Sequence, residues 1–231
     1  MGNYDGLYLP MMIVGYVFSA PFFLLTVRTS QKHGQKASLM TYVKVALFMY
    51  VGVLALLLLW QGGAPQFTLS LMSGGKLTIN LYTIAFILFF GIGYGAYYAT
   101  ADMPIPMVAD CSDYETWRSG KYVPGIMGTL FSLVDKLVSS LGTAIVGFVV
   151  GFIGFTKELP DADVAYVPGM KGVVIILFCI VPMVAWIATL WAMKGYKLTG
   201  ARMKEIQEIN AKRKDAIAGG MSLEEAMEKI Q

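Results

Sequence analysis

Histidine, cysteine and charged residues are scarce in this chain. Of 231 residues, one is histidine, two are cysteine and 14% are charged. With His33 as the single histidine, the sequence excludes histidine-based metal centres and triads that need a histidine base. Cys111 and Cys179 lack partners at metal-ligand spacing, so both are predicted to be free thiols. We expect no enzyme, no metal site and no cofactor, because no nucleophile, ligand cluster or phosphate-binding loop is present.

Apolar residues dominate instead. Hydrophobic residues make up 56% of the chain, and the mean hydropathy is +0.61, whereas a soluble domain has about 25% charged residues. The sequence therefore predicts an integral membrane protein of the all-α class, surrounded by membrane lipid. The net charge of +3 needs no nucleic acid to explain it, because membrane proteins collect Lys and Arg in their cytoplasmic loops.

Five apolar runs are long enough to cross a bilayer, which takes about 20 residues. They cover residues 8–27, 41–60, 77–109, 123–155 and 173–193. The third and fourth are longer than a bilayer requires, and Pro104 and Pro106 predict a kink in the third. Residues 1–195 are thus predicted to form a transmembrane bundle, and residues 196–231 a cytoplasmic helical tail. Within the tail, Ser222 and Glu225 are spaced as a capping box.

The distribution of basic residues predicts the orientation. Five spans place the two ends of the chain on opposite sides of the membrane. The first connection, residues 28–36, contains three Lys and Arg residues, and residues 194–231, after the last span, contain eight. By the positive-inside rule, this connection and the C-terminus lie in the cytoplasm and the N-terminus lies outside. We expect a multi-pass protein of the cell inner (plasma) membrane.

Small and aromatic residues mark the third and fourth runs. Gly91 with Gly95, and Gly147 with Gly151, have the G-x-x-x-G spacing that lets membrane helices approach closely. Ordinary helix packing is the favoured interpretation of both pairs. Tyr98 belongs to a tyrosine stripe that either lines a polar cavity, where it would stack on a sugar ring, or packs between helices.

Four charged residues lie inside apolar runs. Lys44 is near enough to the start of its run for its side chain to reach the interface, whereas Asp102, Asp135 and Lys136 lie deeper. Charges at membrane depth are costly and commonly mark the pathway of a solute or an ion. Lys136 is fifteen residues beyond Lys121, which is roughly 20 Å along a continuous helix and too far for its side chain to reach the interface. A pair between Lys136 and either aspartate would offset the cost of burial. The spacing leaves open whether such a pair serves transport or only structure.

Four further charged residues, Asp110, Asp113, Arg118 and Lys121, follow the third run and by spacing alone suit a solvated turn. However, residues 109–121, ADCSDYETWRSGK, resemble a motif of the glycoside-pentoside-hexuronide cation symporters. These are the melibiose-permease-like branch of the major facilitator superfamily. Lys136 matches a lysine of that family, 23 residues after the second aspartate of the motif. The likeness extends over nearly all of the five spans.

The resemblance implies that the spans are helices eight to twelve of a twelve-helix carrier. The chain would be the C-terminal part of a sugar:cation symporter coupled to Na⁺ or H⁺. Lys136 is expected near the sugar and cation region, and Asp110 and Asp113 in a cytoplasmic charged network with Arg118 and Lys121. Members of this family bind substrate between two six-helix halves. An N-terminal half is therefore an expected partner, and this chain alone is not expected to catalyse transport.

Two other functions remain compatible with the sequence. The chain could belong to a permease of another major facilitator branch. It could also be a non-transporting membrane subunit that associates through its glycine faces.

Overall fold

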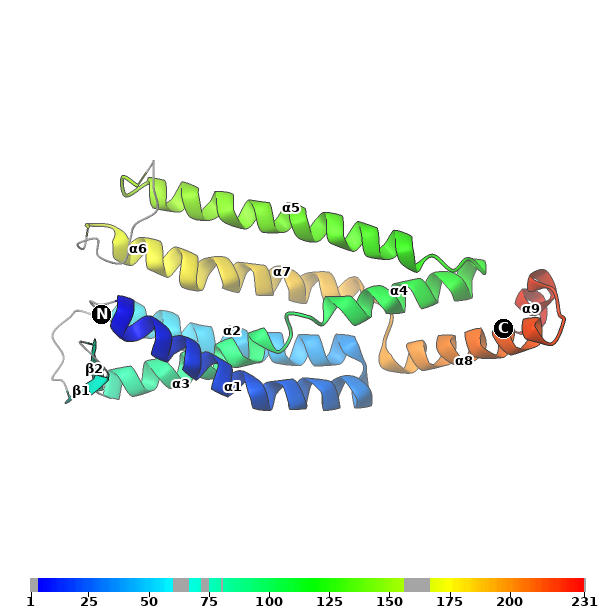
Figure 1. Cartoon of the computed structure of the whole chain (residues 1–231), viewed down its shortest axis with the longest axis horizontal. Coiled ribbons are helices and arrows are strands. Elements are labelled where there is room, and N and C mark those ends of the chain that lie inside the picture. Colours follow the sequence, from blue (N-terminus) through cyan, green and yellow to red (C-terminus); the bar gives the residue numbers. More distant parts are fainter. Residues whose placement is uncertain (1–3, 60–66, 72–74, 80, 156–166, 231) are drawn as a thin grey trace.

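The computed structural model describes residues 4–59, 67–71, 75–79, 81–155 and 167–230. Five helical segments in it are long and apolar enough to cross a membrane: Met12–His33, Gln35–Leu59, Leu81–Tyr98, Pro124–Gly151 and Met170–Gly195. The prediction of an all-α membrane fold with five spans is confirmed. The N- and C-termini lie at opposite ends of the bundle (Figure 1), as an odd number of spans requires.

Helices α1 (Tyr4–His33), α2 (Gln35–Leu59) and α3 (Leu81–Tyr98) form the packed centre of the bundle. Glycine allows α1 and α3 to approach closely, because a Cβ at Gly95 would lie 2.8 Å from the carbonyl oxygen of Phe18. Gly91 likewise faces the ring of Phe18. The packing interpretation of this glycine pair is confirmed.

The third predicted span, residues 77–109, is wrong as a single helix. Helix α3 ends at Tyr98 and α4 begins at Pro104 and runs to Ser119. In the turn between them, the Thr100 hydroxyl donates to the Tyr97 carbonyl at 2.7 Å. Pro104 and Pro106 have no N–H to continue the hydrogen-bond ladder of α3. Both instead lie in the first turn of α4, where an N–H would have no helical partner.

The connection between α2 and α3 contains a hairpin that the sequence did not predict. Strands β1 (Phe67–Leu71) and β2 (Gly75–Ile79) pair antiparallel, with Phe67 opposite Ile79. Leu77, the predicted start of the third span, therefore lies in a strand rather than in a helix. Alternation of Phe, Leu and Ile with Thr, Ser and Lys suits a strand as well as the end of an apolar run.

The fourth and fifth spans are α5 (Pro124–Gly151) and a continuous helical segment made of α6 (Met170–Val174), the π-helical η1 (Ile175–Ile180) and α7 (Val181–Gly195). Packing against α2 is provided by η1 and α7, where Tyr50 meets Trp186 edge-on at 4.8 Å between ring centroids. Cys179 is fully buried in η1, and both cysteines are free thiols, as predicted.

Helix α5 stands apart from the packed centre (Figure 1) and packs mainly against α4, the helix before it. Val150 is its only buried residue. No other described segment comes within 4 Å of a Cβ built on any of its glycines: Gly125, Gly128, Gly142, Gly147 and Gly151. Gly147 and Gly151 therefore make no helix contact within the described chain.

The tail forms α8 (Gly200–Ala218) and α9 (Leu223–Lys229). The Thr199 hydroxyl caps α8, and the predicted capping box of Ser222 and Glu225 opens α9. The start of α8 meets the α1–α2 turn, where Gly34 adopts a φ of +88° directly against Gly200. One end of the bundle therefore carries the α1–α2 turn together with α4, α8 and α9. We call it the tail-side end.

Candidate functional site

At the tail-side end, the second half of α4 lies against α8. Asp113 marks this contact, because its side-chain Oδ2 accepts a hydrogen bond from Gln207 Nε2 at 3.2 Å. Its backbone carbonyl accepts one from Asn210 Nδ2 at 2.9 Å. The sequence placed Asp110 and Asp113 near a polar turn. Both are instead helical, and the turn begins only at Gly120.

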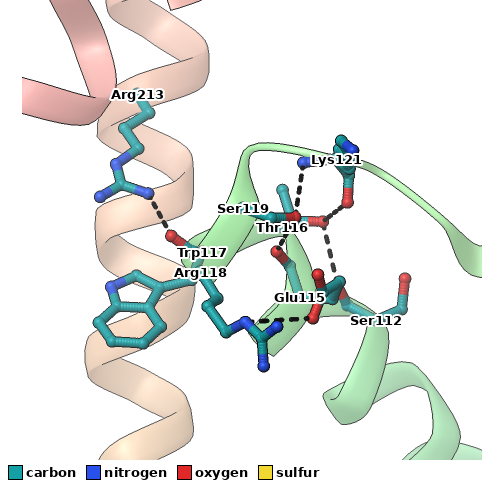
Figure 2. Close-up of polar contacts among 8 residues, drawn as sticks. All are labelled: Ser112, Glu115, Thr116, Trp117, Arg118, Ser119, Lys121 and Arg213. Atoms are coloured by element: carbon teal, nitrogen blue, oxygen red, sulfur yellow. Dashed lines mark hydrogen bonds and ion pairs between the residues drawn. The ribbon is translucent and has the colours of Figure 1, made fainter. Parts of the chain in front are cut away.

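Trp117 of α4 is contacted by two arginines of α8. Its backbone carbonyl accepts a hydrogen bond from Arg213 Nη1 at 2.7 Å, as Figure 2 shows. Its indole ring lies 4.6 Å from the guanidinium carbon of Arg202, and Arg202 is itself paired with Glu205 at 2.6 Å. A cation over an indole ring contributes about 0.5–1 kcal/mol at an exposed site, so one residue of α4 fixes two points of α8.

The roles of Arg213, Arg202 and Gln207 were not predicted from the sequence. One signal was available for Arg213, because it lies four residues after Ile209 on the face that also carries Met203 and Ile206. All four of these residues are buried. A basic residue on the apolar face of a helix is a reason to expect a specific acceptor, since burial of an unpaired charge is costly.

Asp110 has the most clearly altered acidity among the predicted site residues. Burial raises the pKa of its carboxyl group from 3.8 to about 6, and the negative charge of Asp113 adds to the rise. The Tyr196 hydroxyl works in the opposite direction and lowers the pKa. That hydroxyl is buried. Burial also raises the pKa of Tyr196 itself.

The raised pKa of Asp110 predicts that folding stability depends on pH. The folded chain binds this proton more tightly than the unfolded chain. Its contribution is therefore present below the ordinary pKa of 3.8 and is lost as pH rises through about 6. We expect Asp110→Asn to remove this dependence and to stabilise the chain above pH 7, measured by thermal unfolding of detergent-solubilised protein.

Asp113→Asn is the matched comparison for Asp110→Asn. It removes the neighbouring charge that raises the Asp110 pKa, so the transition should remain and move to lower pH. Identical pH profiles for wild type and Asp110→Asn would contradict the assignment.

Arg118 and Lys121 do not join Asp110 and Asp113 in a network within the described chain. The Arg118 Nε lies 3.8 Å from Glu115 Oε2 (Figure 2), in a pair whose arginine is exposed and whose glutamate is half-buried. Pairs of this kind contribute about 0–1 kcal/mol. Lys121 is exposed, and its backbone N–H donates to the Ser119 hydroxyl at 3.3 Å. The hydrogen bonds of the predicted network run to the tail rather than between its own charges.

Lys136 and Asp135 lie in the middle of α5, and both side chains are exposed. The ion pairs of the described residues are Arg118–Glu115, Arg202–Glu205 and Lys229–Glu225. The expected pair of Lys136 with Asp102 or Asp135 is therefore not present in the described chain. The position of Lys136 on a cavity shared with a second half stays a prediction. Atoms outside this bundle would have to form the other wall of that cavity.

Asp102 lies in the α3–α4 turn, where its exposed carboxylate lines an open hollow of about 370 Å³ with Phe23, Gln31 and other residues of α1. Tyr98 is half-buried and packs edge-on against Tyr16 at 5.5 Å and Phe23 at 5.9 Å between ring centroids. Of the two interpretations of Tyr98, these contacts match helix packing.

Among the described residues, no group of three or more His, Cys, Asp and Glu side chains gathers as a metal site. The architecture has five candidate spans, exposed charges in the middle of one of them, and a polar tail docked at one end. These features define a multi-pass membrane protein.

The comparisons with known proteins establish the family. The model of the family described as MFS/sugar transport protein matches residues 3–200, and the chain belongs to this family. Members are transporters rather than enzymes, in agreement with the sequence analysis. The resemblance to the melibiose-permease-like symporters is likewise confirmed, because this family model matches and two relatives are named as symporters, one of them as a putative glycoside/cation symporter.

The relatives cover the chain unequally. An "Uncharacterized 29.9 kDa protein in crtE 3'region" of Pseudescherichia vulneris is 31% identical over 71% of this chain and 53% of that protein. From Escherichia coli, "Putative glycoside/cation symporter YagG" is 30% identical over 43% of the chain. "Inner membrane symporter YicJ" is 32% identical over 44%. The chain matches about half of the first protein and only 21% and 22% of the other two. No solved structure matches.

Proposed function

We propose that this chain is the C-terminal portion of a glycoside:cation symporter of the cell inner membrane. The observation that best supports this proposal is the family match over residues 3–200. The match includes Lys136, a cation in the middle of an apolar span. Lys136 is exposed in this chain. A charge in that position is costly in lipid, so a second half that covers α5 would explain why it is there.

In this proposal the sugar and the coupling cation, Na⁺ or H⁺, bind between α5 and the N-terminal half. Lys136 is the central pathway residue, with Asp135 beside it on the same helix. The tail-side end lies in the cytoplasm, because residues 194–231 contain eight Lys and Arg residues and basic segments stay on that side. Alternating access needs two halves that rock around a shared site, so the chain by itself would not transport.

Uptake measurements test the proposal. The chain is expressed in bacterial cells with the N-terminal half of a glycoside/cation symporter, and uptake of labelled glycosides, pentosides and hexuronides is followed with and without Na⁺ and pH gradients. We expect gradient-dependent uptake of at least one sugar with both halves and none with either half alone. Uptake only of unrelated solutes would instead assign the chain to another branch. No uptake, together with association with a different membrane protein, would make it a non-transporting subunit.

A further inference from the structure

Arg213 connects three segments of the tail-side end. Its side chain is only 7% exposed. Its Nη1 donates to the Trp117 carbonyl on α4 at 2.7 Å and lies 3.0 Å from the Met227 sulfur in α9. Its Nε donates to the Ile230 carbonyl, just after α9, at 2.9 Å. A planar guanidinium with several fixed donors can serve such divergent acceptors at once, whereas the single ammonium of a lysine cannot.

Two of these acceptors, the Trp117 carbonyl and the Met227 sulfur, lie beside the turn from α4 to α5. Gly120 ends α4 with a φ of +72°, and its N–H donates to the Thr116 carbonyl at 2.9 Å. A Cβ at Gly120 would lie 3.4 Å from Leu223 and 3.5 Å from Met227, so α9 covers this turn. Because α5 packs mainly against α4, the direction of α5 depends on the conformation of this turn.

Electrostatic attraction to a membrane surface does not account for the position of α8. Its charged residues outside the buried face are nearly balanced in sign: Lys204, Lys212, Lys214 and the half-exposed Arg202 against Glu205, Glu208 and Asp215. A helix that binds anionic lipid carries an excess of Lys and Arg on its exposed face. The contacts that fix α8 are therefore those on its buried face, with Arg213 at their C-terminal end.

We propose that Arg213 is a positioning residue for transport: it holds α9 over the α4–α5 turn and so sets the direction of α5 and of Lys136. The role in transport rests on the proposed function. The positioning itself is a property of this chain and can be measured without a substrate.

Hydrogen exchange on the full chain in detergent tests the positioning. Arg213→Met keeps an unbranched side chain but leaves both carbonyls without a donor, Arg213→Lys keeps the charge, and Lys214→Met removes a neighbouring exposed charge as the control. We expect the amides of Gly120 and α9 to exchange more than about tenfold faster in Arg213→Met, because buried charge-assisted bonds are lost. Arg213→Lys should be intermediate and Lys214→Met unchanged.

Wild-type exchange in Arg213→Met would overturn the proposal. If Arg213→Met does not fold, Arg213→Lys provides the test. Wild-type exchange of the Gly120 and α9 amides in Arg213→Lys would then overturn the proposal.

Uptake by the chain joined to an N-terminal half gives a second measurement. We expect Arg213→Met to lower the maximal rate at least about tenfold, as for a residue that acts through a conformational step. The KM for the sugar should stay within about twofold. A large rise in KM with an unchanged maximal rate would overturn the positioning role. Absence of uptake by the wild type with every sugar would count against the proposed function, and hydrogen exchange alone would then decide the role of Arg213.

Discussion

Replacing Lys136 with leucine is expected to make insertion of α5 into a bilayer more favourable by about 3 kcal/mol, the difference between a lysine and a leucine at the centre of a span. The reason is that Lys136 is exposed in the middle of α5 and has no ion pair within the described chain. The fraction of full-length chains in which α5 inserts can be measured in microsomes with a glycosylation acceptor placed after α5.

Lys121→Leu is the control for Lys136→Leu and uses the same reporter. Lys121 is also an exposed lysine, but it lies just before α5 begins at Pro124, where its side chain reaches the interface. Its replacement should change insertion by less than about 1 kcal/mol. An equal effect of the two substitutions would show that Lys136 does not lie at membrane depth.

Lys136→Leu should have the opposite effect on transport. When the chain is joined to an N-terminal half, Lys136→Leu is expected to abolish sugar uptake although it favours insertion. A residue that is costly to insert and necessary for uptake is retained for transport rather than for stability. Unchanged uptake would remove Lys136 from the pathway and leave only its family likeness.

The five spans could be predicted from the sequence because hydropathy over about 20 contiguous residues is a local property. The break between α3 and α4 was harder to predict from the sequence. Pro104 and Pro106 indicated a kink, yet a kinked helix and two separate helices share the same apolar composition. Only the position of the turn shows that Asp102 lies outside a helix and lines a hollow.

The tail contacts could not be predicted, because they depend on which segments meet in space. Asp113 was identified from a local motif, whereas its partners Gln207 and Asn210 lie 94 and 97 residues later. The sequence placed Arg213 on the tail among other basic residues. It did not indicate that the carbonyl groups of Trp117 and Ile230 would surround it.

A last substitution, Gly34→Ala, is expected to destabilise the tail-side end by about 2–5 kcal/mol. Two costs add: alanine is strained at a φ of +88°, and its Cβ would lie 2.6 Å from the backbone of Gly200. Gly220→Ala is the matched control, since its φ is +98° and no other segment lies within 4 Å. It should cost only the backbone strain, about 1–2 kcal/mol.

Gly200→Ala separates the steric cost from the backbone strain. Gly200 is the first residue of α8, and alanine is a better helix former than glycine by about 1 kcal/mol. Its Cβ, however, would lie 2.9 Å from the backbone of Gly34. We therefore expect Gly200→Ala to release α8, seen as faster cleavage by Glu-C protease at Glu205 and Glu208. If Gly200→Ala instead protects these sites, the contact between the α1–α2 turn and α8 does not hold the tail.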